Sequence, residues 1–412
     1  MKQPTRRDVI KSLMVASSVC LPGSGLRSGP AKAAFRRGIN IWPWFALTRE
    51  FAPPSRAYAW PPFESDRPQP SAADLAALHR VGFDFVRLPV DPGPFLAANR
   101  DQRQQLLATV ERAVDSILAA GLSVVLNPHP NEATHFWNPQ QMLDESPRGS
   151  FGSFVDLVVD AARLLRTAPD RRAMLELMNE PPQPCGSVDW QKQQSHLLAS
   201  ARSAAPDLRV MLTGACGSLP EGLLALAPTD DPNVVFTFHY YWPYLFSHQG
   251  ATWMTEEPIY RYLRSVPWPA AAGDLDSTVA IFRKQVMADA ALSKAEREAL
   301  LIQGQDKLAT YFAAEVDGSN IDKDFAPIDE WGELHNISAD RILLGEFGAT
   351  KWAAPPDRAR YVRDVRGAAE ARGFGWAFWN MFDVMGVTVD DHTHVLDGAI
   401  LAALGLQAPD GR

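Results

Sequence analysis

Two glutamates that end apolar, strand-like segments are the residues of this chain best suited to chemistry. Residues 175–181 read Leu-Glu-Leu-Met-Asn-Glu-Pro and residues 343–348 read Leu-Leu-Gly-Glu-Phe-Gly, so each segment runs directly into a glutamate, Glu180 or Glu346. A carboxylate at the point where a buried strand meets its loop is costly unless it is used. Two such carboxyl groups can cleave a glycosidic bond, one as general acid and the other as nucleophile. Two ordinary surface glutamates are the alternative reading.

Further polar and aromatic residues fall at the ends of other apolar segments, where they can support such a pair. These are Arg87, His129, Asn179, His239, Tyr241 and Trp379. An arginine can supply positive charge that keeps a nearby carboxylate ionised, and a tyrosine hydroxyl can donate to it. Each histidine taken alone is more often part of a core than of a catalytic site. Their joint occurrence at successive segment ends favours a single site.

Eight apolar segments predict the strands that must position these residues. They are residues 35–41, 83–90, 122–127, 173–178, 209–213, 234–239, 341–345 and 374–380. The segments are continuously apolar, as strands covered on both faces should be. Helical patterns lie between them, at residues 71–81, 102–120, 151–167, 189–204, 355–372 and 397–405.

This alternation predicts an α/β fold, the (β/α)8 or TIM barrel, in which residues at the carboxyl ends of the strands face the active site. An open, doubly wound sheet is the alternative, but no glycine-rich phosphate loop follows the first strand. About 100 residues, 240–340, separate the sixth strand from the seventh. Ser293 and Glu296 form a capping box there that predicts a helix to about Ala314. We expect a long helical insertion at about 243–335, placed over the mouth of the barrel.

The motifs resemble those of glycoside hydrolase family 5, the large family of retaining cellulases, mannanases and related enzymes. The matching motifs are Arg-Leu-Pro at 87–89, Asn-Glu-Pro at 179–181, His-Tyr-Tyr at 239–241, Gly-Glu-Phe-Gly at 345–348 and Trp-Asn at 379–380, with His129 after the third strand. Residues 240–251 are similar to a branch of bacterial cellulase-like members. The resemblance covers essentially the whole mature chain.

The resemblance implies a role for each site residue. Glu180 is the acid/base and Glu346 the nucleophile, while Arg87 and Tyr241 keep Glu346 ionised. Asn179 hydrogen-bonds the sugar 2-hydroxyl, and His129 and His239 orient hydroxyl and carboxyl groups around the scissile bond.

Tryptophans give a second line of support, because flat aromatic faces stack on the C–H groups of sugar rings. Trp379 is expected to form the floor of the sugar-binding site beside the scissile bond. Trp42 and Trp242 are expected to bind substrate further along. Five other tryptophans could extend the cleft or pack the loops, namely Trp44, Trp60, Trp137, Trp253 and Trp268.

The N-terminus has the features of an export signal. Residues 5–11, Thr-Arg-Arg-Asp-Val-Ile-Lys, match the twin-arginine pattern, a weakly apolar stretch follows, and Ala31-Lys32-Ala33 supplies a cleavage site. We expect residues 1–33 to be a signal peptide read by the twin-arginine export machinery, and residues 34–412 to be one catalytic domain, periplasmic or secreted. Loss of residues 1–33 removes six basic and one acidic side chain, which moves the formal charge from −8 to −13. So acidic a protein is poorly suited to nucleic acid or anionic membranes.

Two of the three cysteines lie outside the signal. Cys185 and Cys216 each lie just beyond a predicted strand, so a disulfide and two free thiols are both open. Residues 390–394, Asp-Asp-His-Thr-His, are read as a polar loop and not as a metal site, because no third distant ligand accompanies them. We expect no cofactor and no metal.

The sequence as a whole predicts an exported, monomeric glycosidase that acts with retention of configuration, most simply an endo-β-1,4-glucanase. A β-mannanase, a β-1,3-glucanase, and an exo-acting or transglycosylating β-glycosidase use the same residues, because the loops choose the sugar. A polysaccharide-binding protein that has lost catalysis is the alternative from another class, and retention of both glutamates argues against it.

Overall fold

Eight parallel strands close into a barrel in the computed structural model, which describes residues 35–64 and 66–408. The strands are β1 (Arg37–Asn40), β4 (Phe85–Val90), β5 (Ser123–Pro128), β6 (Ala173–Glu176), β7 (Arg209–Thr213), β8 (Val234–His239), β9 (Ile342–Phe347) and β10 (Gly375–Phe378). Their order round the barrel is β1-β10-β9-β8-β7-β6-β5-β4, and β4 closes on β1. The prediction of a TIM barrel built from these eight segments is confirmed. The proposed signal, residues 1–33, lies outside the described residues.

Apolar side chains from the barrel strands fill its interior, as the continuous apolar segments require. One cluster contains Phe85, Val125, Met174, Met211, Val235, Leu343 and Ala377, contributed by seven different strands, together with Phe35. The β1 residue Gly38 makes room for this layer, since a Cβ there would lie 2.1 Å from the ring of Phe85. The other faces of the strands belong to a larger core shared with the surrounding helices.

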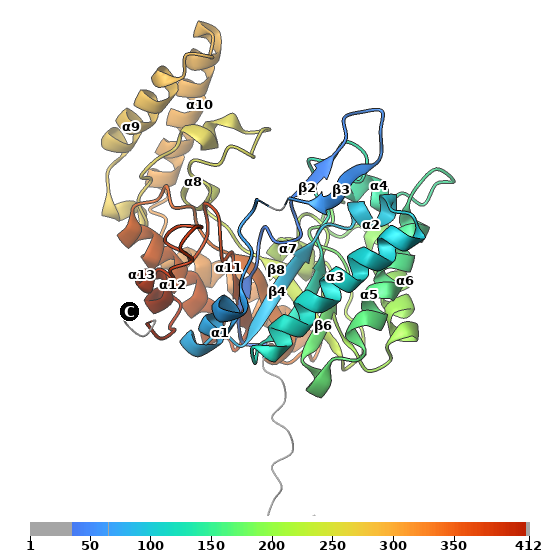
Figure 1. Cartoon of the computed structure of the whole chain (residues 1–412). Helices are drawn as coiled ribbons and strands as arrows, with labels where there is room; N and C mark the ends of the chain where they lie inside the picture. The colour runs from blue at the N-terminus through green and yellow to red at the C-terminus, as the bar shows by residue number, and fades with distance from the viewer. Residues whose placement is uncertain (1–34, 65, 409–412) are drawn as a thin grey trace, which may run out of the picture. The chain divides into compact units, whose positions relative to one another are not determined.

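Helices cover the outside of the barrel (Figure 1). They include α1 (Ala72–Val81), α3 (Arg100–Ala119), α5 (Phe151–Leu165), α6 (Val188–Ala204), α12 (Pro355–Ala371) and α13 (Gly398–Ala403). Helix α1 begins at a capping box, in which the Ser71 hydroxyl accepts from the Asp74 amide while the Asp74 carboxylate accepts from the Ser71 amide. Shorter helices are α2 (Gly93–Ala97), α4 (Pro139–Met142) and α7 (Pro220–Leu224).

The insertion between β8 and β9 is shorter than the predicted 243–335. Helix α11 (Gly318–Leu334) packs against α12 and α7, and its Phe325 and Trp331 rings contact Phe238 and Phe236 of β8. It is therefore the barrel's own helix between these two strands. The sequence concealed it because Pro327 lies inside the helix, where proline normally breaks the pattern.

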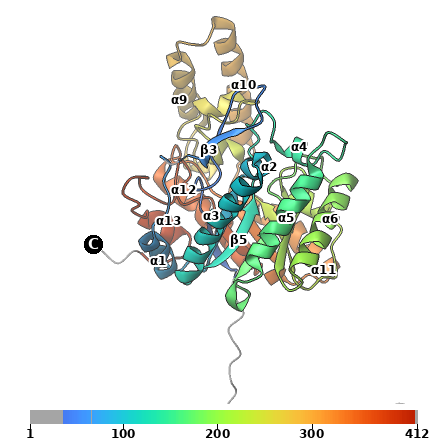
Figure 2. The same ribbon diagram turned by 45° about the vertical axis from the view of Figure 1, so that its right-hand side comes forward.

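The true insertion, residues 241–317, ends in two helices that project from the barrel. It contains α8 (Tyr244–Ser247), η2 (Pro258–Tyr262), η3 (Ala270–Ala272), α9 (Leu275–Ala288) and α10 (Lys294–Ala313). Helix α10 starts at the predicted Ser293–Glu296 capping box. Both views place α9 and α10 away from the barrel, above the strand ends (Figures 1 and 2). Within the described residues, no helix is both long and apolar enough to cross a membrane.

A β-hairpin that the sequence did not reveal follows β1. It pairs β2 (Thr48–Glu50) with β3 (Tyr58–Phe63), and Figure 1 shows it at the same end of the barrel as the insertion. The Thr48 hydroxyl donates to Asp91 Oδ2 at 3.0 Å, which ties the hairpin to the residue after β4. Two loop elements therefore flank the carboxyl ends of the strands.

Candidate active site

The carboxyl ends of β6, β8 and β9 bring three of the predicted residues together. Glu346 lies within β9, His239 is the last residue of β8, and Glu180 follows β6 by four residues. One ligand-type atom from each side chain lies within 4.8 Å of the other two. Carboxyl groups at about 5–5.5 Å are typical of retaining glycosidases, whereas inverting enzymes need about 6.5–9.5 Å.

Arg87 organises the floor of this site from the middle of β4. Its Nη1 donates to Glu346 Oε1 at 2.6 Å, while Nε and Nη2 donate to the two oxygens of Glu176 at 2.7 and 2.9 Å. The side chain is fully buried. Burial opposes its charged form, but Glu176 and Glu346 outweigh burial and raise the pKa of Arg87. The guanidinium therefore remains charged next to both carboxylates.

Two members of this network were missed by sequence reasoning. Glu176 ends β6 with its side chain fully buried, and Asn40 ends β1 with Oδ1 accepting from Arg87 Nη1 at 2.9 Å. The Asn40 amide in turn donates to the Gly345 carbonyl at 3.1 Å, beside Glu346. The available signal was a single polar residue at the end of an otherwise apolar segment.

Glu346 is held by partners on both carboxyl oxygens. Besides Arg87 at Oε1, the Tyr241 hydroxyl donates to Oε2 at 3.0 Å. Burial raises the pKa of Glu346, whereas His239, Arg87 and the Tyr241 hydrogen bond act to lower it. Two charge-stabilising donors make Glu346 the better of the two carboxyls at holding a negative charge.

Glu180 has a different environment. Its Oε1 lies 2.8 Å from His239 Nδ1, and 34% of its side chain remains exposed. Its carboxyl group is nevertheless enclosed by the site, and burial raises the pKa of Glu180 to about 7, with Arg87 opposing and Glu176 reinforcing the shift. Glu180 can therefore carry a proton near neutral pH while Glu346 is ionised, as a glycosidase pair requires.

His239 joins the two glutamates as a neutral ring. Burial lowers the pKa of His239 to about 4, against the opposing influence of Glu346. Its Nδ1 lies 2.8 Å from Glu180 and 3.7 Å from Glu346, whereas its buried Nε2 has no hydrogen-bond partner among the described residues. We assign the proton to Nδ1, which can then donate to Glu180, because a proton on Nε2 would leave a buried N–H unpaired and direct the Nδ1 lone pair at two carboxyl groups.

Asn179 and His129 form a second arm of the site. Asn179 Oδ1 accepts from Arg87 Nη2 at 2.7 Å, and its amide lies 3.4 Å from His129 Nε2. The other ring nitrogen of His129 lies 2.9 Å from Asn127 Oδ1. Burial lowers the pKa of His129 well below its usual range, with Arg87 adding to the effect. The accepting oxygen of Asn179 is thus occupied, which leaves its amide N–H groups facing His129 and the site.

Trp379, Trp42 and His129 form one aromatic wall. The Trp379 ring stacks on His129 with centroids 5.7 Å apart, and Trp42 lies 5.5 Å from Trp379 and 5.2 Å from His129. Trp242 makes no ring contact with this wall, although it follows Tyr241 directly, and 37% of it is exposed. The structure therefore brings Trp42 and Trp379 to the site and leaves Trp242 at its edge.

The remaining tryptophans divide between surface and core. Trp60 and Trp253 are about half exposed, on the β2–β3 hairpin and in the insertion. Trp44 and Trp137 are partly buried against the core. Trp268 is fully buried, its indole N–H bonded to Asp364, so of the two roles left open by the sequence it has the packing role. It packs the insertion onto the barrel.

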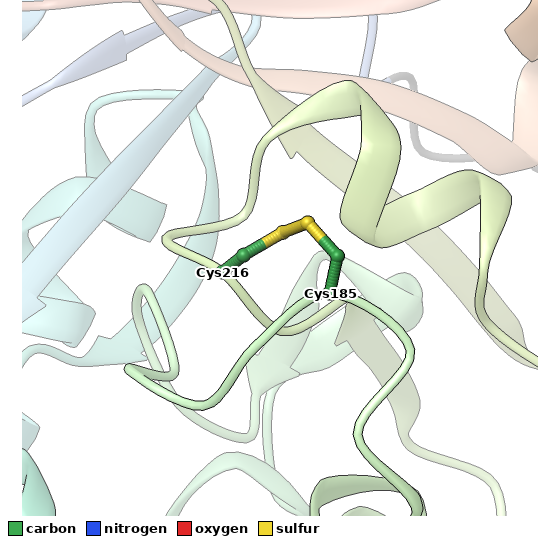
Figure 3. The surroundings of a disulfide bond; sticks show 2 residues. All are labelled: Cys185 and Cys216. Carbon is green, nitrogen blue, oxygen red and sulfur yellow. A yellow bond between two sulfur atoms is a disulfide. The ribbon is translucent and has the colours of Figure 1, made fainter.

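A disulfide joins Cys185 and Cys216, as Figure 3 shows. Their Cα atoms lie 4.9 Å apart, and the bond connects the loop after β6 to the loop after β7. Since the loop after β6 also carries Glu180, the crosslink belongs to the surroundings of the site.

The polar segment 390–394 makes local hydrogen bonds. Asp390 accepts from the backbone of His392 and Thr393, Asp391 accepts from the Asp383 amide, and His394 bonds Asp74 at the start of α1. Among the residues that the structure describes, the three groups close enough to share a metal ion are Glu180, His239 and Glu346. Their unequal environments suit proton transfer and nucleophilic attack.

Comparison with known proteins finds a matching family and several similar sequences. The sequence model of the family described as Cellulase (glycosyl hydrolase family 5) matches residues 58–383. The chain is 25% identical to Endoglucanase C of Acetivibrio thermocellus over 352 residues, which are 84% of this chain and 91% of that protein. It is 26% identical to Cellodextrinase A of Ruminococcus flavefaciens over 188 residues, 44% of this chain and 54% of that protein.

Solved structures share the fold. The cellulose synthase subunit Z of Clostridioides difficile superposes with a TM-score of 0.65 at 22% identity, covering 90% of this chain and 99% of that one. Cel5A of Thermotoga maritima in complex with cellobiose gives 0.65 at 21% identity, with 90% and 98% covered. The same enzyme with mannotriose gives 0.63 at 20% identity, with 90% and 98% covered.

Proposed function

Since the chain belongs to glycosyl hydrolase family 5, the cellulase family, we propose that it is an endo-acting β-1,4-glucanase that retains the anomeric configuration. The observation that carries the mechanism is the pairing of Glu180 and Glu346 within 4.8 Å in unequal surroundings. Most of the curated relatives it matches are endoglucanases, among them Endoglucanase C of Acetivibrio thermocellus.

In the first step, Glu346 attacks the anomeric carbon and Glu180 gives its proton to the leaving oxygen. Glu346 enters this step ionised, because Arg87 and Tyr241 donate to its two oxygens. Glu180 enters it protonated, because burial holds its pKa at about 7. The product is a covalent glycosyl-enzyme on Glu346 and a released oligosaccharide.

In the second step, water hydrolyses that ester with Glu180 acting as base. Once Glu346 is esterified it no longer carries negative charge, so the guanidinium of Arg87 acts more strongly on Glu180 and its pKa falls. The Glu180 carboxylate can then take a proton from the attacking water. The amide of Asn179 lies where it can donate to the sugar 2-hydroxyl, a contact that strengthens as the ring becomes oxocarbenium-like.

The aromatic wall supports a sugar site beside the scissile bond. Trp379, stacked on His129, offers an apolar face to one sugar ring, and Trp42 extends that face. A β-mannan is the second candidate substrate, because Cel5A of Thermotoga maritima has been solved with both cellobiose and mannotriose.

The protein acts outside the cytoplasm in this proposal, as a monomer. The twin-arginine pattern at residues 5–11 and the cleavage site at 31–33 support export. The Cys185–Cys216 disulfide also suits an oxidising compartment. Fractionation of cells that carry the full chain checks this. We expect the wild type outside the cytoplasm and the Arg6→Lys/Arg7→Lys variant retained inside the cell. Wild-type protein that stays in the cytoplasm would contradict export.

Product analysis of the mature protein tests the activity itself. Residues 34–412 are incubated with cellulose-type β-glucan, mannan, xyloglucan and β-1,3-glucan, and the products are separated by size. Mixed oligosaccharides from the cellulose-type substrate, absent with Glu180→Gln, support an endo-β-1,4-glucanase. A single small product from chain ends indicates exo action, and affinity for a polymer without new reducing ends contradicts catalysis.

A further inference from the structure

The loop that carries Glu180 is braced by a second loop through the Cys185–Cys216 disulfide. Between Glu180 and the crosslink, the two backbones also pair directly: the Cys216 amide donates to the Gln183 carbonyl at 2.7 Å, and the Gly217 amide donates to the Pro181 carbonyl at 3.0 Å. The crosslink and these two hydrogen bonds form a short ladder that ends at the residue next to Glu180. Figure 3 shows the two loops side by side at the bond.

The backbone of both loops is held in a conformation that needs such support. Cys216, Gly217 and Ser218 have φ values of 55°, 69° and 57°, and Glu180 itself has a φ of 29°. Three of these four residues carry a side chain, for which the left-handed region is unfavourable. Conformations of this kind persist where the surroundings over-determine them. The disulfide is one of the constraints that do so.

The loop of Cys216 also holds His239, the hydrogen-bond partner of Glu180. Ser218 is fully buried, and its carbonyl accepts from the His239 amide at 2.8 Å. The Ser218 hydroxyl accepts from Thr213, the last residue of β7, at 2.7 Å. Since His239 Nδ1 contacts Glu180, the loop of Cys216 supports both the backbone of Glu180 and its hydrogen-bond partner.

From these contacts we infer that the Cys185–Cys216 disulfide is a positioning element for the catalytic acid, so that breaking it lowers the efficiency of proton donation by Glu180. The inference rests on the proposed function, in which Glu180 protonates the leaving group. Cys185 is exposed and Cys216 is partly exposed, which favours access of a reductant to the bond. No other cysteine follows residue 33, so a reductant acts on this bond alone.

Reduction of the folded mature enzyme, with leaving groups of different quality, tests the inference. Dithiothreitol gives two electrons and two protons to the bond, which yields two thiols while the reagent closes to a cyclic disulfide. The kcat/KM is then measured on two aryl β-glycosides of the preferred disaccharide. The phenyl glycoside needs an acid for departure, whereas the 2,4-dinitrophenyl glycoside hardly needs one.

We expect reduction to lower kcat/KM at least tenfold on the phenyl glycoside and less than twofold on the dinitrophenyl glycoside. The Cys185→Ser/Cys216→Ser variant should show the same split without reductant and no further change with it. If the bond resists reduction in the folded protein, this variant alone tests the inference. If the variant does not fold, reduction of the wild type tests it.

Two results overturn the inference. Equal losses on both substrates mean that the bond supports the fold as a whole, and no loss on either means that the hydrogen bonds suffice without it. An oxidised enzyme that cleaves neither glycoside contradicts the proposed function and the inference with it. An oxidised enzyme that cleaves both and ignores reduction contradicts the inference alone.

Discussion

Arg87 Nη1 donates to Glu346 Oε1 at 2.6 Å, while Nε and Nη2 of the same guanidinium donate to the two oxygens of Glu176. One buried cation thus serves two carboxylates, only one of which faces the reaction. Glu176 fixes the plane of the guanidinium, and this fixed plane aims a donor at Glu346. The charge and the orientation of the proposed nucleophile therefore depend on a residue that touches no substrate.

Removal of that cation should harm both stability and activity. Arg87→Met leaves Glu176 buried without its partner, which typically lowers the free energy of unfolding by about 3–5 kcal/mol. Arg87→Lys keeps the charge but loses the two-sided fork, so we expect kcat to fall by roughly 10²-fold or more. Urea unfolding and steady-state kinetics measure the two effects. Arg163→Lys, on the exposed face of α5, is the matched control, and equal behaviour of the two lysine variants would contradict this role.

Loss of the nucleophile should abolish turnover and permit chemical rescue. Glu346→Ala is expected to lower kcat by on the order of 10⁴-fold or more, since no other carboxylate can form the glycosyl-enzyme. Azide added to this variant, with an aryl β-glycoside, should enter the vacated space and give the inverted α-glycosyl azide. Product analysis by NMR identifies the anomer. Glu298→Ala, at an exposed position on α10, should retain full activity, and near-wild-type turnover by Glu346→Ala would refute the assignment.

The pH dependence of kcat/KM should follow the proton on Glu180. Burial raises the pKa of this group to about 7, and only its protonated form can act as acid in the first step. The kcat/KM on unactivated substrate should therefore fall as the pH rises above about 7, towards tenfold per pH unit. Glu180→Gln should lose about 10²–10⁴-fold on such a substrate. A profile whose alkaline limb is the same in wild type and Glu180→Gln would assign that limb to another group.

Asp91 should make the stability of the fold pH-dependent. Burial raises the pKa of Asp91 from its usual 3.8 to about 7, although the Gly93 amide and the Thr48 hydroxyl hydrogen-bond its carboxylate and oppose the shift. The folded protein therefore keeps a proton that the unfolded chain releases. Its contribution to stability is complete below pH 3.8 and is lost as the pH rises through about 7.

Thermal unfolding at several pH values checks this linkage. The Tm of Asp91→Asn should decline less between pH 5 and pH 8 than that of the wild type, because the amide does not titrate. Asp189→Asn removes a carboxylate whose side chain is 85% exposed, so it should leave the pH dependence unchanged. Parallel Tm curves for wild type and Asp91→Asn would show that Asp91 is ionised in the folded state throughout.

The barrel was predictable because its signal is local and repeated. Strands buried on both faces must be apolar throughout. The capping boxes at Ser71 and Ser293 mark the first residues of two helices in the sequence. The hairpin after β1 escaped because its second strand contains Pro61 and Pro62, which argue against a strand in any single sequence. Helix α11 escaped because of Pro327.

The site was predictable only in part. Glu180 and Glu346 were visible because each ends an apolar segment in a recognisable motif. Glu176 and Asn40 were not, because a single polar residue at the end of a strand has no pattern of its own. Their importance depends on barrel closure, which pairs β1 with β4 and aligns Asn40 with Arg87. Arg87 lies 47 positions from Asn40 and 89 positions from Glu176 along the chain, so these contacts follow from the topology and not from local sequence.

The insertion between β8 and α11 offers an exchangeable cassette for redesign. Its outer part, α9 and α10, is fastened mainly within the cassette itself, through Tyr262 to Asp289 and Lys307 to Glu257. The barrel closes without it, since β8 pairs directly with β9 and Tyr240 bonds Asp324 of α11. Grafts of other lengths can therefore replace residues 275–313, which form α9 and α10, while Trp268 keeps the base of the insertion packed on the barrel and both glutamates stay in place. Selection for new sugar preferences can act on this cassette as a separate part.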